Sequence, residues 1–118
     1  MADGFNKVQI QGKWCDSKEE YWVALALDKL KLRYRFQVPI FGGTFRRGGL
    51  VIDFVVWNPL PIAVQVHGEY WHPDSMTSDV ERIAEGKIKS VYPRMVILWG
   101  KDLQTPEMAL DTVRQKVK

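Results

Sequence analysis

The strongest constraint on the fold comes from two apolar runs separated by a turn sequence. Residues 50–57 and 62–66 are rich in β-branched and aromatic side chains, which favour strands. The segment between them, Asn-Pro-Leu-Pro, is typical of a tight turn. These residues therefore predict a hairpin of two adjacent antiparallel strands at the centre of the fold.

This hairpin carries polar groups where apolar ones are expected. Asp53 lies inside the first run, and Gln65, His67, Glu69 and His72 crowd the end of the second. Burying an unpaired polar group costs about 1 to 3 kcal/mol. A chain that accepts this cost is usually placing a site there, so this end of the hairpin is the candidate site.

The sequence before the hairpin predicts a helix and then a strand. Ser17 and Glu20 have the spacing of a capping box, and the helix formers that follow predict a helix over residues 18–31. Residues 33–38 alternate polar with aromatic or apolar side chains and predict the first strand of the core. Residues 7–14 alternate more weakly, and we expect residues 1–16 to form a short extended arm.

The sequence after the hairpin predicts a helix, a strand and a last helix. Ser78 and Glu81 form a second capping-box pair, which predicts a helix over residues 79–91. The apolar run at 95–99 predicts a strand inside the sheet, and Thr105 followed by Pro106 predicts the start of a final helix. The fold class is therefore α/β, with a mixed central sheet of about four strands flanked by helices.

Length and composition place these elements in one domain. A chain of 118 residues can bury one sizeable core but not two. No apolar run approaches the roughly 20 residues that cross a bilayer, and no signal-peptide pattern is visible, so we expect a cytoplasmic protein without membrane contacts. One cysteine, Cys15, excludes an internal disulfide. The net charge of +3 favours nucleic acid as a partner without establishing it.

The polar residues of the hairpin suit phosphodiester chemistry when they are taken together with Glu20. Asp53 and Glu20 offer hard oxygen ligands for a divalent ion such as Mg2+, and His67 and His72 can carry protons or hold a negatively charged oxygen. Each residue also has a plain structural interpretation, as a capping-box partner, a turn acceptor or a satisfied polar group. The catalytic hypothesis gains weight because the four occur together.

The same residues resemble a known nuclease family. The first helix with Ser17 and Glu20, the segment VIDFV around Asp53, and the histidine segment with its five-residue step from His67 to His72 are similar to the restriction-endonuclease-like superfamily. Within it, the very-short-patch repair endonucleases and the related small homing-type nucleases are the most similar groups. The resemblance runs from residue 17 to about residue 113, and it implies a restriction-endonuclease-like core and a metal-dependent DNA endonuclease.

The resemblance also implies a role for each residue. Asp53 would bind Mg2+, or Mn2+ in its place, helped by the backbone carbonyl of Val66. Glu20 would hold a metal-bound water. His67 and His72 would contact the scissile phosphate or move protons. Asp79 would orient His67.

Three positions depart from the family pattern. Gln65 stands where much of the superfamily has a second acidic ligand, and His67 occupies the usual lysine position. Glu69 stands where the repair enzymes carry a cysteine of a zinc site. Because the two histidines alone do not match a zinc motif, we expect no structural zinc. These departures put mismatch recognition in doubt more than catalysis.

Four arginines are the candidate DNA-binding residues. Arg33 and Arg35 belong to the first predicted strand, and Arg46 and Arg47 to the glycine-rich segment 41–49. Glycine lets the backbone approach a phosphate closely, and arginine can grip it with two donors. A solvated turn with two charges is the commoner meaning of such a segment.

The sequence leaves three functions open. The leading hypothesis is a metal-dependent endonuclease that cleaves or nicks DNA as a monomer or homodimer. A structure-selective nuclease such as a Holliday junction resolvase is the rival within this class, and it would have to be a dimer because two symmetric cuts need two sites. The third is a non-catalytic DNA-binding module with a degenerate site, suggested by Gln65.

Overall fold

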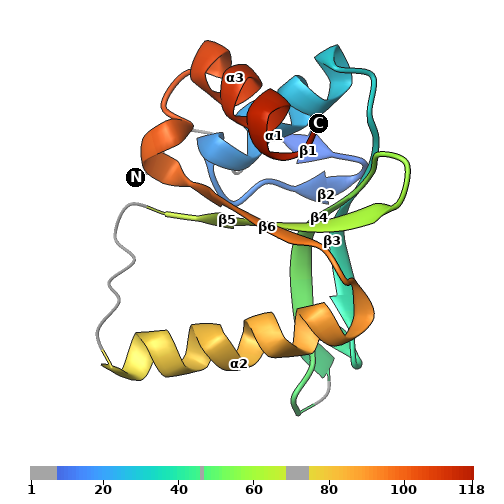
Figure 1. The fold of residues 1–118 in the computed structure, drawn as a ribbon, viewed down its shortest axis with the longest axis vertical. Helices are drawn as coiled ribbons and strands as arrows, with labels where there is room; N and C mark the ends of the chain where they lie inside the picture. The colour runs from blue at the N-terminus through green and yellow to red at the C-terminus, as the bar shows by residue number, and fades with distance from the viewer. Residues whose placement is uncertain (1–7, 46, 69–74) are drawn as a thin grey trace.

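The computed structural model describes residues 8–45, 47–68 and 75–118, which are arranged in three layers. Helices α1 (Lys18–Lys29) and α3 (Pro106–Lys116) lie together on one face of a sheet, and α2 (Ser75–Val91) lies on the other (Figure 1). The sheet contains β3 (Arg33–Ile40), β4 (Leu50–Trp57), β5 (Pro61–His67) and β6 (Met95–Trp99). The remaining described elements are β1 (Gln9–Ile10), β2 (Lys13–Trp14) and the 3-10 turns η2 (Gly43–Phe45) and η3 (Gly100–Asp102).

The four long strands form one mixed sheet in the order β3-β4-β5-β6. β4 is antiparallel to both of its neighbours, β3 and β5, and β6 runs parallel to β5 after the crossover through α2. The predicted α/β class, with a mixed four-stranded sheet flanked by helices, is therefore confirmed. The sequence order of α1, β3, β4, β5, α2, β6 and α3 also agrees with the prediction.

The position predicted for residues 95–99 was wrong. These residues form β6 as expected, but β6 lies at an edge of the described sheet rather than inside it. Its continuous apolar run has a different cause, because helices cover both faces at this edge. Leu98 packs in the core beneath α1 and α3, whereas Met95 packs in the core beneath α2.

The helix boundaries follow the capping predictions in two cases out of three. The Ser17 hydroxyl accepts a hydrogen bond from the Glu20 N–H at 3.3 Å, and the Thr105 hydroxyl accepts one from the Met108 N–H at 3.1 Å. The predicted start of α2 was wrong, because the helix begins at Ser75 and includes Ser78, although it ends at Val91 as predicted. No Gly or Pro interrupts residues 75–78, so nothing in the sequence stops the helix from starting one turn earlier.

Two apolar cores join the layers, one on each face of the sheet. The larger core joins α1 and α3 to the strands and includes the fully buried Leu27, Phe54 and Val113. The smaller core lies beneath α2 and contains Ile40, Ile52, Val55, Ala63 and Ile88. Within residues 82–91, Ile88 is the buried side chain. Among the described side chains, α2 is therefore attached by fewer buried apolar residues than the opposite layer.

The N-terminal segment covers the free edge of β3. β1 and β2 pair as a short antiparallel ribbon, and the Gln11 side chain between them imitates a neighbouring strand. Its Nε2 donates to the Tyr34 carbonyl at 2.7 Å, and its Oε1 accepts from the Phe36 N–H at 3.0 Å. An uncovered edge strand is open to pairing with other chains, so this contact protects the sheet.

In the described ranges, no helix combines the length and the apolar composition that spanning a membrane requires.

Candidate active site

Asp53 lies where the hydrogen-bond ladders on both sides of β4 are interrupted. The β3–β4 register pairs Phe36 with Phe54 and Val38 with Ile52, but Asp53 itself forms no pair in the described register. On the other side, the β4–β5 pairing runs from Trp57 to Phe54 and ends one residue before Asp53. Asp53 therefore occupies a local opening in the middle of the sheet.

Side-chain hydrogen bonds replace the missing ladder bonds between β4 and β5. The Gln65 Oε1 accepts from the Asp53 N–H at 2.7 Å, and the Asp53 Oδ2 accepts from the Val66 N–H at 2.7 Å. Because the N–H and C=O of a strand residue point to the same side, the Val66 carbonyl also faces β4. Asp53 and the Val66 carbonyl, which the sequence resemblance paired as ligands, thus lie on the same side of β5.

The opening coincides with a change of face along the β3–β4 hairpin. Side chains two residues apart in a strand normally share a face. Phe36 and Phe54 pack in the core beneath α1 and α3, yet Val38 and Ile52 pack in the core beneath α2. Gln37, opposite Asp53, has a φ of 55° in the left-handed region, which turns the strand at this point. The distal half of the hairpin can therefore reach down beside α2 (Figure 1).

Glu20 brings a second carboxylate to the same region from the first turn of α1. It is 8% exposed, and its Oε1 accepts from the Asp16 N–H at 2.9 Å. Burial raises the pKa of Glu20 to about 7; the Asp16 N–H opposes this shift, and the negative charges of Asp53, Asp16 and Glu19 reinforce it. Glu20 therefore both closes the helix cap and lies within the electrostatic field of Asp53.

Asp16 is a residue of this region that the sequence reasoning missed. It lines an open groove of about 610 Å³ together with Asp53. Burial, followed by the charges of Glu20 and Asp16, raises the pKa of Cys15 to about 11. The negative charges of Glu20 and Asp16 thus add to the effect of burial at Cys15. The available signal was the acidic residue directly before the Ser17 cap, because a helix start already brings Glu20 to the same place.

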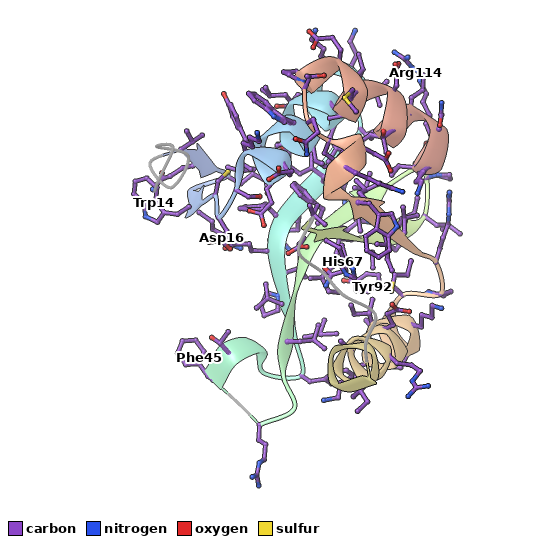
Figure 2. All side chains as sticks on the ribbon, turned by 90° about the vertical axis from the view of Figure 1, so that its left-hand side faces the viewer. Trp14, Asp16, Phe45, His67, Tyr92 and Arg114 are labelled. Atoms are coloured by element: carbon purple, nitrogen blue, oxygen red, sulfur yellow. The ribbon has the colours of Figure 1, made fainter. Side chains whose placement is uncertain are left out.

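His67 ends β5 two residues after Gln65. Its ring meets the Trp99 ring edge to face, with centroids 5.1 Å apart and planes at 88°. Ala63 of the same strand packs beneath α2, so the alternation of the strand directs Gln65 and His67 to that side. Figure 2 shows His67 between the strands and α2. The structure thus orients the imidazole by packing against Trp99, a contact that the sequence did not predict.

Several predicted site residues lie outside what the structure describes. Glu69, His72 and Arg46 belong to the residues without a described placement, and the same holds for the side chain of Asp79, whose backbone is part of α2. Their assigned roles stay predictions.

The predicted DNA-binding arginines do not form one cluster. Arg33 is paired in register with Trp57, and its guanidinium lies 4.6 Å from the centre of that ring. At about 3.3 Å per residue, Trp57 is roughly 13 Å along β4 from Asp53. Arg47 is exposed in the loop at the opposite end of the hairpin. Arg33 and Arg47 therefore cannot grip the same phosphate.

The two carboxylates offer oxygen atoms, the ligand type that divalent cations such as Mg2+ prefer. Each carboxylate accepts a hydrogen bond from a backbone N–H through one of its oxygens. In the described ranges, no three His, Cys, Asp or Glu side chains gather as a metal-binding group.

Comparisons of the chain with family models, with curated proteins and with solved structures each gave no match.

Proposed function

We propose that the protein is a metal-dependent DNA endonuclease, a hydrolase of phosphodiester bonds with a restriction-endonuclease-like core. One observation carries the proposal: two carboxylates from different elements, Glu20 of α1 and Asp53 of β4, interact electrostatically at an opening of the sheet. Like charges repel each other more strongly where water is partly excluded, and a divalent cation between them would relieve the repulsion. The element order and the resemblance of the histidine segment support the same function.

The roles of the residues follow from their surroundings. Asp53 and the Val66 carbonyl would hold the cation, and Glu20 would hold a water bound to it; the cation would supply positive charge against the phosphate oxygens. The hydrogen bonds from the Val66 N–H to Asp53 and from the Asp16 N–H to Glu20 fix both carboxylates in place. His67, oriented by Trp99, would stabilise negative charge on the phosphate or transfer a proton.

A nuclease assay tests this function. Supercoiled plasmid, mismatched duplex and a four-way junction are incubated with the protein in Mg2+ or Mn2+, beside the variant Asp53→Asn. We expect the parent to cut at least one substrate and Asp53→Asn to cut none, because the amide removes the charge that holds the cation. Asp111→Asn, on the exposed face of α3, is the matched control and should cut like the parent.

Activity of Asp53→Asn equal to that of the parent would contradict the proposed site. If the parent leaves all three substrates intact in both metals, the non-catalytic DNA-binding module becomes the better reading. Gln65 supports that alternative, since its side-chain oxygen is bonded to the Asp53 N–H rather than offered to a ligand.

A further inference from the structure

A continuous groove leads from the carboxylates to the glycine-rich loop. The depression that contains Asp16 and Asp53 adjoins a second one of about 470 Å³, which is lined at its far end by the loop residues Gly42, Gly43 and Phe45. The two depressions share the lining residues Lys13, Gln37, Thr44 and Val51. Figure 2 shows Trp14, Asp16 and Phe45 along one side of the molecule, with Asp16 between the two aromatic residues.

The groove has a fixed positive charge in its wall. The Lys13 Nζ donates to the carbonyls of Phe36 and Gln37 at 3.1 and 3.0 Å, which holds the ammonium group against the edge of β3. An ammonium group has three N–H donors, so one donor and the charge stay available. A phosphate group is the natural partner for this position.

Two aromatic side chains flank this charge and are exposed to solvent. Trp14 is 55% exposed in the first depression, and Phe45 is 96% exposed in the second. The Trp14 carbonyl accepts from the Gln37 Nε2 at 3.2 Å, which ties β2 to β3. The loop that carries Phe45 is tightly closed, because a Cβ on Gly49 would collide with the Gly43 backbone. Both rings are thus presented by backbone that is held in place.

We propose that this groove binds an unpaired DNA strand, whose bases stack on Trp14 and Phe45 while its backbone passes Lys13 toward Asp53. Exposed rings beside a positively charged side chain are typical of single-strand binding, because every base offers a face for stacking. A paired duplex hides these faces and would present phosphates alone. The proposal rests on the proposed nuclease function for the purpose of the groove, and it names the substrate class of that site.

The test measures binding apart from cleavage. Fluorescence anisotropy of a labelled single strand and of the matched duplex is recorded in EDTA for the parent, Trp14→Ala, Phe45→Ala and Leu60→Ala. We expect about fivefold or greater weakening of single-strand binding for each aromatic variant, and less than twofold for the duplex. Leu60 is 75% exposed and lines neither depression, so its variant should bind like the parent.

Conservative variants separate stacking from folding. Trp14→Phe and Phe45→Tyr keep a ring, so we expect them to recover most of the single-strand affinity, with unfolding temperatures equal to that of the parent. The groove assignment is overturned if the parent prefers the duplex, if the alanine variants bind the single strand like the parent, or if both DNA forms lose affinity equally. Selective single-strand binding without cleavage of any substrate would support the groove and contradict the nuclease function. Cleavage by the parent, with alanine variants that bind the single strand like the parent, would support the nuclease function and contradict the groove.

Discussion

The chemistry proposed for this protein depends on where single polar atoms lie. The Asp53 carboxylate accepts a hydrogen bond from the Val66 N–H, and the Asp53 N–H donates one to the Gln65 side chain. Two neighbouring residues of β5 therefore hold Asp53 in place. Burial raises the pKa of Glu20, and the negative charge of Asp53 adds to the shift. We therefore expect the ionisation of Glu20 to lower the stability of the metal-free protein, which can be measured apart from cleavage.

The stability of the metal-free protein should depend on the ionisation of Glu20. Its pKa is about 7 in the folded protein and 4.5 in the reference state, so the folded protein binds the proton more tightly. Stability is therefore full below about pH 4.5 and is lost as the pH rises through about 7. At roughly 1.4 kcal/mol per pKa unit, the loss is on the order of 3 kcal/mol.

Thermal unfolding in EDTA between pH 4.5 and 8 measures this effect. We expect Glu20→Gln, which keeps an oxygen for the Asp16 N–H, to lose less stability over this range than the parent. Glu107→Gln, in the exposed first turn of α3, controls for the removal of a helix-start carboxylate. If the stability of the parent and of Glu20→Gln changes equally with pH, the ionisation of Glu20 does not destabilise the folded protein.

The role of His67 can be tested at the same scale. If it stabilises charge or transfers a proton, His67→Ala should lower the cleavage rate about 100-fold to 10,000-fold while substrate affinity changes little. The substitution also removes the edge-to-face contact with Trp99, so unfolding temperature is recorded in parallel. A rate loss below tenfold would assign His67 to packing alone.

At the scale of elements, the sequence predicted which segments form helices and strands better than it predicted where they lie in the sheet. Helix caps and apolar periodicity are local signals, so α1, α3 and the four strands could be found from them. Three features were not predictable from local signals: the edge position of β6, the left-handed Gln37, and the turn of the hairpin beside Asp53. These depend on which layers cover a strand and on how the whole sheet twists.

The candidate site divides in the same way. Asp53 could be found because a carboxylate inside an apolar run is costly, and Glu20 because of its capping box. Asp16 had one signal, its place directly before the Ser17 cap. Lys13 had none, since it reaches the groove only through the fold of the N-terminal ribbon. The sequence predicted that all four arginines bind DNA. In the structure, however, Arg33 and Arg47 lie at opposite ends of the β3–β4 hairpin.

At the same scale, we predict that α2 opens more easily than α1 when the smaller core is weakened. Ile88 is fully buried in the smaller core, and Ile88→Ala should lower the free energy of unfolding by about 2 to 5 kcal/mol. Because that core is small, we expect hydrogen exchange to accelerate in α2 more than in α1. Ile83→Ala, at a position that is 61% exposed on the same helix, is the control and should change stability by less than about 0.5 kcal/mol. Uniform acceleration across both helices would mean that α2 does not open separately.

At the scale of the whole molecule, the proposed function requires a DNA-binding surface at one end of the β3–β4 hairpin. The groove, Asp53 and the glycine-rich loop lie toward one end, and the stacked pair of Arg33 and Trp57 lies at the other. A strand that passes through the groove would meet the loop and miss Arg33. Electrostatic contacts to phosphates can separate the two ends, because each neutralised phosphate contributes close to one unit to the slope of log affinity against log salt.

Two double variants make the comparison. Replacing Arg46 and Arg47 by Ala should weaken binding on every DNA tested and flatten the salt slope by at most roughly two units. Replacing Arg33 and Arg35 by Ala should leave the slope within about half a unit of the parent, because Arg33 is engaged with Trp57 and lies away from the groove. The slope is measured by anisotropy over a series of salt concentrations. The opposite pattern, with the slope lost in the Arg33 and Arg35 variant alone, would move the DNA to the other end of the hairpin and leave the loop as a solvated turn.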